Sequence, residues 1–231
     1  MTWTAGPLVA FDTETTGLDV EVDRVVTAAL VLRGPAGTSV RTWLVDPGVD
    51  IPAEATAIHG IATAHAVAGG SAPRDALDEV ARELAAHQLH GVPVVAYNAA
   101  FDLTLLDVEL ARHGLPTLPE RLGRAVRPVL DPLVLDRDAD PAREGKRRLA
   151  DLCAHYGVAV PGALHTAEVD ALATLDVLAA LVRRHPGLAA ATPQALHDHQ
   201  VGAHRRWVDE LDESRRDRPY VGAGSDGRWP V

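Results

Sequence analysis

The sequence is poor in several residue types, and each shortage excludes something. Cys153 is the only cysteine among 231 residues, so the chain can form neither an internal disulfide nor a thiolate metal cage, which fits a reducing compartment. No apolar run approaches membrane-spanning length, and residues 1–4 lack the basic and apolar regions of a signal peptide. We therefore expect a cytoplasmic protein.

Basic side chains are also scarce. The chain has 22 Lys and Arg against 32 Asp and Glu, which gives a formal net charge of −10. Such a balance argues against a broad, sequence-independent grip on duplex DNA, but a short single-stranded end needs few phosphate contacts. The length and the 47% hydrophobic content predict one well-buried domain with an appendage.

Two acids follow the first apolar run of the chain. Residues 8–11, LVAF, are typical of a strand, and Asp12 and Glu14 then point to the same face because strand side chains alternate. Two convergent carboxylates beside an apolar strand require water or a cation, and oxygen-only ligands favour Mg²⁺ or Mn²⁺. The D-x-E spacing occurs three times, but the other two pairs lie in a charged loop and in a predicted helix.

Two further acids, Asp102 and Asp170, and a histidine, His165, are also candidates for a site. Residues 92–97 predict a buried strand that turns directly into a helix at 101–113, so Asp102 lies at the carboxyl end of a strand, where open α/β sheets bind ligands. His165 lies in a predicted loop, and Asp170 lies on the predicted helix at 166–184. A loop histidine near an acid on a rigid helix suits a general base.

Hydrophobic periodicity predicts an α/β fold. Strands at 24–33 and 38–45 should form a hairpin, residues 127–131 a fifth strand, and residues 136–148 a charged loop, with further helices at 73–90, 149–156 and 193–216. This order implies a mixed five-stranded sheet with helices on both faces and the first strand central, beside the fourth. We expect a domain at 1–186 and a C-terminal helical extension with a tail at 187–231.

Three sequence blocks support a family assignment. FDTETTGL, YNAAFDLTLL and HTAEVD resemble the blocks of the DEDDh (DnaQ-like) exonucleases, the family of the proofreading epsilon subunit of bacterial DNA polymerase III. AIHGI at 57–61 and GKRRLADLCAHYGV at 145–158 also match, so the resemblance covers about residues 7–184. It implies a ribonuclease H-like fold and a 3′–5′ exonuclease that releases nucleoside 5′-monophosphates from single-stranded DNA.

The resemblance implies residue roles. Asp12, Glu14, Asp102 and Asp170 would hold two Mg²⁺ or Mn²⁺ ions, with Asp12 bridging them, and His165 would take the proton from the attacking water. Six further residues would shape the pocket for the last nucleotides: Thr13, Thr15, Leu18, His59, Asn98 and Phe101.

Several of these residues have structural alternatives. Phe101 and Leu18 could belong to the core, His59 could be an ordinary loop residue, and Asn98 could be a helix cap. We expect Asp131, another acid at a strand end, to be a structural cap.

Other functions stay open at this point. Relatives of this fold trim RNA or short oligoribonucleotides, and discrimination of the 2′-hydroxyl depends on pocket details that the sequence does not give. A non-catalytic nucleic-acid-binding subunit is a second alternative. A third is a proofreading subunit whose extension, around Trp207 and Leu211, docks on a DNA polymerase.

Overall fold

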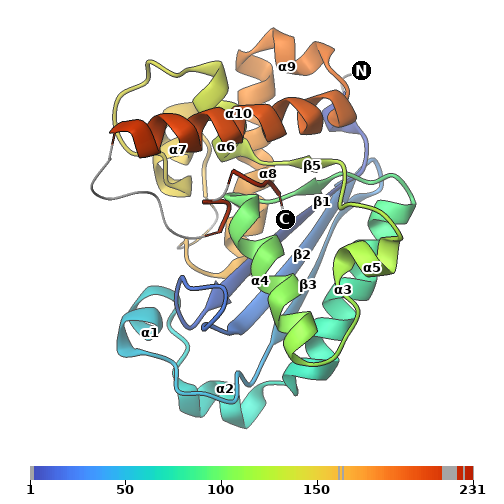
Figure 1. Cartoon of the computed structure of the whole chain (residues 1–231), viewed down its shortest axis with the longest axis vertical. Coiled ribbons are helices and arrows are strands. Elements are labelled where there is room, and N and C mark those ends of the chain that lie inside the picture. The colour runs from blue at the N-terminus through green and yellow to red at the C-terminus, as the bar shows by residue number, and fades with distance from the viewer. Residues whose placement is uncertain (1–2, 161, 163, 215–222, 226, 231) are drawn as a thin grey trace.

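A mixed five-stranded sheet runs through the centre of the computed structural model, which describes residues 3–160, 162, 164–214, 223–225 and 227–230 (Figure 1). The strand order is β3-β2-β1-β4-β5. β1 pairs antiparallel with β2 and parallel with β4. The predicted sheet, with the first strand central and beside the fourth, is confirmed. The strands are β1 (Leu8–Thr15), β2 (Val25–Gly34), β3 (Gly37–Leu44), β4 (Val94–Val95) and β5 (Val129–Leu130).

β2 and β3 form the predicted hairpin. Their ladder runs from the pair Thr27 and Leu44 to the pair Gly34 and Gly37, with two residues in the turn. Gly37 has a φ of 116°, a conformation that side chains with a Cβ rarely adopt. The tight turn therefore depends on this glycine.

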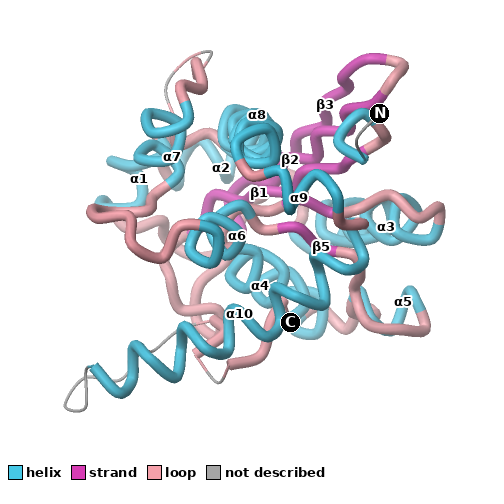
Figure 2. The backbone as a smooth tube through the Cα atoms, turned by 90° about the horizontal axis from the view of Figure 1, so that it is seen from above, coloured by secondary structure: helices cyan, strands magenta, loops and turns pink. Residues whose placement is uncertain are grey.

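Alternate residues of β1 face two different cores. Val9 and Phe11 pack with α3 (Pro73–Leu89) and α4 (Ala99–Arg112), while Leu8 and Ala10 pack with α8 (Ala167–Arg184). Figure 2 shows α8 on one side of the strands and α3 and α4 on the other, so the predicted helices on both faces are confirmed. Because strand side chains alternate, the positions that follow on β1 are also divided between the two faces.

β4 and β5 are shorter than the predicted strands at 92–97 and 127–131. Each has a proline next to it, and a proline nitrogen cannot donate to a ladder. The carbonyls still take part: Pro93 accepts from the Val9 N–H at 3.0 Å, and Pro128 accepts from the Val94 N–H at 3.1 Å. Regular pairing therefore extends over only two residues of each strand.

The prediction of a charged loop at 136–148 is wrong for residues 136–139, because these belong to α6 (Pro132–Ala139). Asp131 caps this helix by accepting from the Leu133 N–H, and Asp136 is fully buried. α5 was not predicted either. The remaining helices are α1 (Ala53–His59), α2 (Thr63–Gly69), α5 (Leu118–Leu122), α7 (Leu149–Tyr156), α9 (Pro186–Ala190) and a 3₁₀ helix at Trp3–Ala5.

The long C-terminal helix α10 (Pro193–Ser214) packs along β5. Gln200 accepts from the Asp131 N–H at 2.8 Å and donates to the Val129 carbonyl at 3.1 Å, and His197 Nδ1 accepts from the Val129 N–H at 3.1 Å. Trp229, from the C-terminal segment, is buried beside the His197 ring. The boundary near residue 186 stays a prediction, and residues 215–222, 226 and 231 lie outside the described residues.

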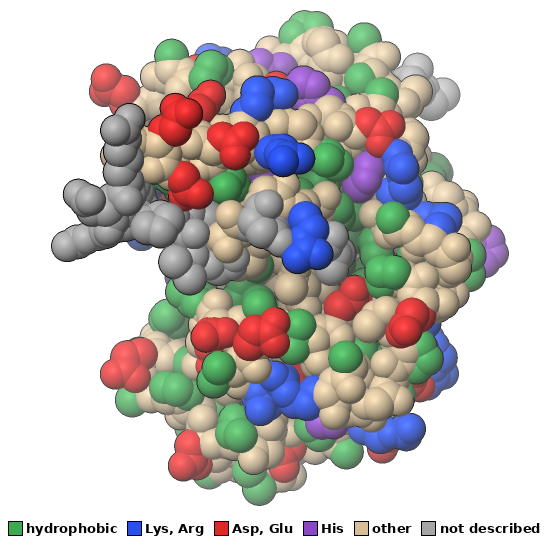
Figure 3. Space-filling model, viewed as in Figure 1, with side chains coloured by type: hydrophobic (Ala, Val, Ile, Leu, Met, Phe, Trp, Pro, Cys, Tyr) green, Lys and Arg blue, Asp and Glu red, His purple; other side chains and the backbone are tan. Residues whose placement is uncertain are grey.

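The face crossed by α10 carries acidic and basic side chains close together (Figure 3). Within the described residues, no helix is both long and apolar enough to span a membrane.

Candidate active site

Three carboxylates meet at the carboxyl end of β1. One ligand oxygen from each of Asp12, Glu14 and Asp170 lies within 4.8 Å of the other two. Asp12 and Glu14 continue the face of β1 that packs on α8, and Asp170 lies in the first turn of α8. Three carboxylates at this separation are a suitable donor set for a hard divalent cation.

Asp102 approaches the same strand from the opposite face. It lies in the first turn of α4, is 5% exposed, and its Oδ1 accepts from the Thr13 N–H at 3.0 Å and from the Thr13 hydroxyl at 2.6 Å. The structure therefore brings Asp12, Glu14 and Asp170 into one group. Asp102 is held beside it, on the residue that separates the two strand acids.

The pKa values of all four acids are raised, and burial is the largest cause in each case. Burial raises the pKa of Asp12 well above its ordinary value, and the carboxylates of Asp102, Asp170 and Glu14 raise it further. Burial, then the charges of Asp170 and Asp102, raise the pKa of Glu14 to about 7. Burial raises the pKa of Asp102 to about 7 against the hydrogen bonds from Thr13.

Asp170 follows the same pattern, since burial raises its pKa while the hydrogen bond from the His165 N–H lowers it. Within the described part of the chain, none of the four carboxylates forms a salt bridge with Lys, Arg or His. Acids that are crowded and partly desolvated without a cationic partner fit a site built for metal ions.

His165 lies in the loop before α8, as predicted, and is exposed. Its backbone has a φ of 81°, which is rare for a residue with a side chain, and its N–H donates to Asp170 Oδ1 at 3.1 Å. The residue also lines a cavity of about 250 Å³ together with Glu14 and His59. The loop thus holds an imidazole next to the acid group.

The six predicted nucleotide-contacting residues have different environments. Thr13 is buried on Asp102, and the Thr15 hydroxyl donates to the Gly17 carbonyl at 2.6 Å within its own turn. Leu18 is 81% exposed, so the alternative that it belongs to the core is wrong. Phe101 is partly buried against the larger core.

The structural alternatives for His59, a loop residue, and for Asn98, a helix cap, are also wrong. His59 is not a loop residue, because it ends α1 and is buried, with Nδ1 accepting from the Ile61 N–H at 3.1 Å. Burial lowers the pKa of His59. Asn98 occupies the position before α4 with a φ of 58°, but its side chain makes no capping hydrogen bond.

Asp131 supplies the cap that Asn98 does not. Its carboxylate accepts from the Asn98 N–H at 3.1 Å, the Ala99 N–H at 2.9 Å and the Leu133 N–H at 2.9 Å. The predicted structural cap is confirmed, and it fixes the starts of two helices. One of them is α4, which carries Asp102, so Asp131 positions an acid of the site.

The D-x-E pair on α4 serves a different purpose. Asp107 accepts from the Leu118 N–H at 2.8 Å, whereas Glu109 is 1% exposed and forms ion pairs with Arg24 and Arg112. The prediction that these two helical acids diverge is confirmed. The sequence context, and not the spacing, separated them from Asp12 and Glu14.

Several known proteins are similar to this chain in sequence. The exonuclease (RNase_T) family model matches residues 9–178. The chain is 35% identical over 188 residues to a DNA polymerase III subunit epsilon-like protein of Rhodobacter capsulatus, a match that covers 79% of this chain but 24% of that protein. It is 33% identical over 190 residues to an uncharacterized exonuclease of Escherichia phage 186, covering 78% and 91%.

Solved structures agree on the fold. E. coli exonuclease I in complex with a dA16 oligonucleotide superimposes with a TM-score of 0.63 at 19% identity, over 89% of this chain and 45% of that one. The family model spans most of the chain, and the phage exonuclease aligns over nearly its whole length. The chain therefore belongs to the exonuclease family, among the divalent-metal-dependent DEDDh 3′–5′ exonucleases with a ribonuclease H-like fold.

Proposed function

We propose that this chain hydrolyses the terminal phosphodiester at the 3′ end of single-stranded DNA and releases nucleoside 5′-monophosphates. The observation that carries the proposal is the convergence of Asp12, Glu14 and Asp170 beside buried Asp102, with raised pKa values and no salt bridge among the described residues. The dA16 complex of E. coli exonuclease I, a protein of the same fold, supports a single-stranded DNA substrate.

The carboxylates would hold Mg²⁺ or Mn²⁺. The charges of Asp102, Asp170 and Glu14 all raise the pKa of Asp12, so Asp12 is the acid that interacts with each of the others. It would therefore be the ligand that two ions share. When bound, two divalent ions lower the pKa of the attacking water and neutralise the leaving 3′ oxygen. Asp102 would join the set from the α4 side, where Thr13 already orients one of its oxygens.

His165 would take the proton from the attacking water. Its backbone N–H donates to the carboxylate of Asp170, which holds the backbone of this residue beside the acids. Imidazole accepts and releases protons near neutral pH, which a general base in a hydrolase requires. The exposed position leaves the ring accessible to a substrate.

The terminal nucleotides would lie against the six predicted contact residues. The exposed Leu18 offers an apolar surface that can pack against any base, the partly buried Phe101 offers a ring on which a base can stack, and Asn98 is exposed at the start of α4. The buried His59 Nε2 has no hydrogen-bond partner at bonding distance among the described residues, and it carries the ring proton because Nδ1 accepts from the Ile61 N–H, so it can donate to a substrate oxygen. Thr13 would contribute through its backbone and Thr15 through its hydroxyl, which here donates to the Gly17 carbonyl.

A role beside a DNA polymerase subunit is the second part of the proposal. The Rhodobacter capsulatus relative is described as epsilon-like, which supports proofreading or repair. Of the helix around Trp207 and Leu211, the part around Leu211 would be the docking element, because the Trp207 ring lies under the Arg137 guanidinium. A pull-down with the full chain and with a chain lacking residues 187–231, each first checked for folding by circular dichroism, tests this role.

The direct test is gel-resolved digestion of a 5′-labelled single-stranded DNA with Mg²⁺, Mn²⁺ or EDTA, beside the equivalent RNA. We expect a metal-dependent ladder that shortens from the 3′ end, stronger on DNA. Asp170→Asn should abolish the ladder, while Asp176→Asn, an acid further along α8 that pairs with Arg33, should not. A stronger RNA lane would reassign the substrate, and an intact substrate in every lane would leave a binding role.

A further inference from the structure

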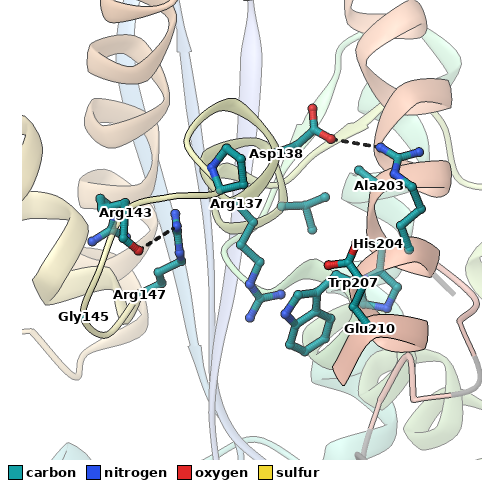
Figure 4. A pocket seen from close by; sticks show the side chains of 12 residues that line it. Arg137, Asp138, Arg143, Gly145, Arg147, Ala203, His204, Trp207 and Glu210 are labelled. Carbon is teal, nitrogen blue, oxygen red and sulfur yellow. Dashed lines mark hydrogen bonds and ion pairs between the residues drawn. The ribbon is translucent and has the colours of Figure 1, made fainter. Parts of the chain in front are cut away.

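We propose that a groove between α6, the following loop and α10 binds the phosphodiester backbone of the single strand on the 5′ side of the nucleotides to be removed. This arginine groove is defined by Arg137, Arg143, Arg147, Arg206, Trp207 and His204, and encloses about 550 Å³ (Figure 4). It lies outside the group of four acids. The inference rests on the proposed function, because it assigns a binding surface to the remainder of the DNA strand whose 3′ end would be hydrolysed.

The groove is cationic in a chain whose net charge is −10. Four arginines line it against two acids, Asp138 and Glu210, and one of these arginines, Arg206, pairs with Asp138 at 3.0 Å. Arg143 and Arg147 pair with the same buried carboxylate, that of Asp136, so the pair keeps one surplus positive charge. Anionic oxygens are the complement of such a surface.

One buried donor in the groove has no partner. The Arg143 side chain is 10% exposed, yet its Nε is buried without a hydrogen-bond partner among the described residues. His204 is also buried; its Nε2 lies 3.0 Å from the Gly224 carbonyl, and its Nδ1 has no partner there. Buried polar atoms are nearly always satisfied, so the Arg143 Nε–H points to an acceptor such as a phosphate oxygen. His204 Nδ1 is an acceptor while Nε2 donates to Gly224, so it would need a donor such as water or a base N–H.

The groove also has an aromatic element, which favours a nucleic acid over a simple anion. The Arg137 guanidinium lies over the Trp207 ring at 3.7 Å. A guanidinium stacked on an indole keeps its N–H groups in the plane, directed away from the ring, where they can meet phosphate oxygens. Single-strand binding proteins combine cationic and aromatic groups in this way without reading sequence.

Two contacts join the groove to the start of α4, which carries Asp102. The Tyr97 hydroxyl, one residue before Asn98, donates to the Arg147 carbonyl. On the other side, Gly224 lies between the His204 ring and Ala100, because a Cβ built there would meet His204 Nε2 at 2.8 Å and the Ala100 Cβ at 3.1 Å. The walls of the groove thus contact the residues at the start of α4, the helix that carries Asp102.

Fluorescence anisotropy on the full chain in EDTA tests the groove, with 5′-fluorescein oligothymidylates of about 4 and about 12 nucleotides as probes. Affinity should rise with length for the wild-type chain. The double variant R137A/R206A should bind the longer probe roughly tenfold more weakly. The slope of log affinity against log salt concentration should become shallower by about 0.7 for each phosphate that the variant no longer binds.

Arg82→Ala is the matched control, because Arg82 is an exposed arginine that pairs with a carboxylate on the distant helix α3. It should bind both probes as the wild type does. A double variant that retains the full length dependence overturns the inference. Equal affinity of the wild type for both lengths also overturns it.

The same longer probe, incubated with the wild-type chain and Mn²⁺, separates this inference from the proposed function. Digestion without any effect of R137A/R206A on binding retains the function and rejects the groove. Loss of length-dependent binding in the variant, with no digestion by the wild type, retains the groove and rejects the function.

Discussion

Two groups of carboxylates in this fold differ in how their charge is compensated. Asp136 is completely buried, and two arginines, Arg143 and Arg147, and the Tyr156 hydroxyl all reach it. These partners outweigh burial and lower the pKa of Asp136. Around Asp12 the partners are other acids, and the pKa values rise instead.

The comparison shows that burial alone does not mark a functional acid. The group around Asp136 is complete, because the chain itself supplies the countercharge. The group around Asp12 has no countercharge among the described residues, so it depends on something from outside the chain. Removing a charge should therefore have opposite consequences for stability in the two places.

The largest effect is expected at Asp12. Asp12→Asn should lower the rate of hydrolysis on the order of 10³-fold or more, because it removes the proposed shared metal ligand. It should leave the metal-free protein at least as resistant to thermal unfolding at pH 7, because a repelled carboxylate becomes neutral. Rates in metal-buffered assays and melting curves in EDTA measure both; a near-normal rate would remove Asp12 from the site.

The next effect concerns the proton acceptor. His165→Ala should reduce turnover on the order of 10²- to 10⁴-fold while Mn²⁺ affinity changes little, because the ring is not one of the proposed ligands. Calorimetric Mn²⁺ titration and single-turnover digestion separate the two properties. His90→Ala, an exposed histidine at the end of α3, is the control. Unaltered turnover would require a different base.

Asp136→Asn tests the compensated group. Removal of one member of a buried ion pair leaves the other uncompensated, so the free energy of unfolding should fall by about 3–5 kcal/mol. Asp138→Asn, an acid of the same helix whose pairs with Arg206 and His199 are more exposed, should change it by less than about 1 kcal/mol. Urea unfolding of both variants decides. Equal decreases in the free energy of unfolding of the two variants would mean that the buried ion pairs of Asp136 contribute no more to stability than the exposed pairs of Asp138.

The smallest effect is a pH dependence. The folded-state pKa of Glu14 is raised from 4.5 to about 7, and that of Asp102 is raised from 3.8 to about 7. The folded state thus binds more protons than the unfolded state between these values, so stability without metal should decrease as the pH rises from about 4 to about 7.

Saturating Mg²⁺ or Mn²⁺ should oppose this decrease, since a bound cation favours the ionised carboxylates. Melting temperatures across this range, with EDTA and with each metal, test the pH dependence. A metal-free protein whose stability rises over the same range would contradict the raised pKa values.

The sequence predicted the sheet and the acids because both depend on local patterns. The apolar run before Asp12 and the alternation along β1 determined the strand, its face and its neighbours. The helix α6 could not be recognised in the same way. Its buried charge, Asp136, is paired with arginines 7 and 11 residues further along the chain, and only tertiary structure shows that pairing.

Candidate site residues could be named from the sequence, but their arrangement could not be predicted. Spacing alone does not show that Asp102 binds Thr13 from the opposite face of the sheet. It also does not show that His59 is buried or that Arg137 of α6 lies over the Trp207 ring of α10. These features arise where segments distant in the sequence meet.

The pairing of α10 with β5 has a consequence for self-association. A terminal strand normally leaves N–H and C=O groups that can pair with a strand of another molecule. Here the outer N–H and C=O of Val129 are bonded to His197 and Gln200, and the next outer N–H, that of Asp131, is also bonded to Gln200. A foreign strand finds these groups already occupied, so side chains of a helix protect this edge against the intermolecular pairing that begins aggregation.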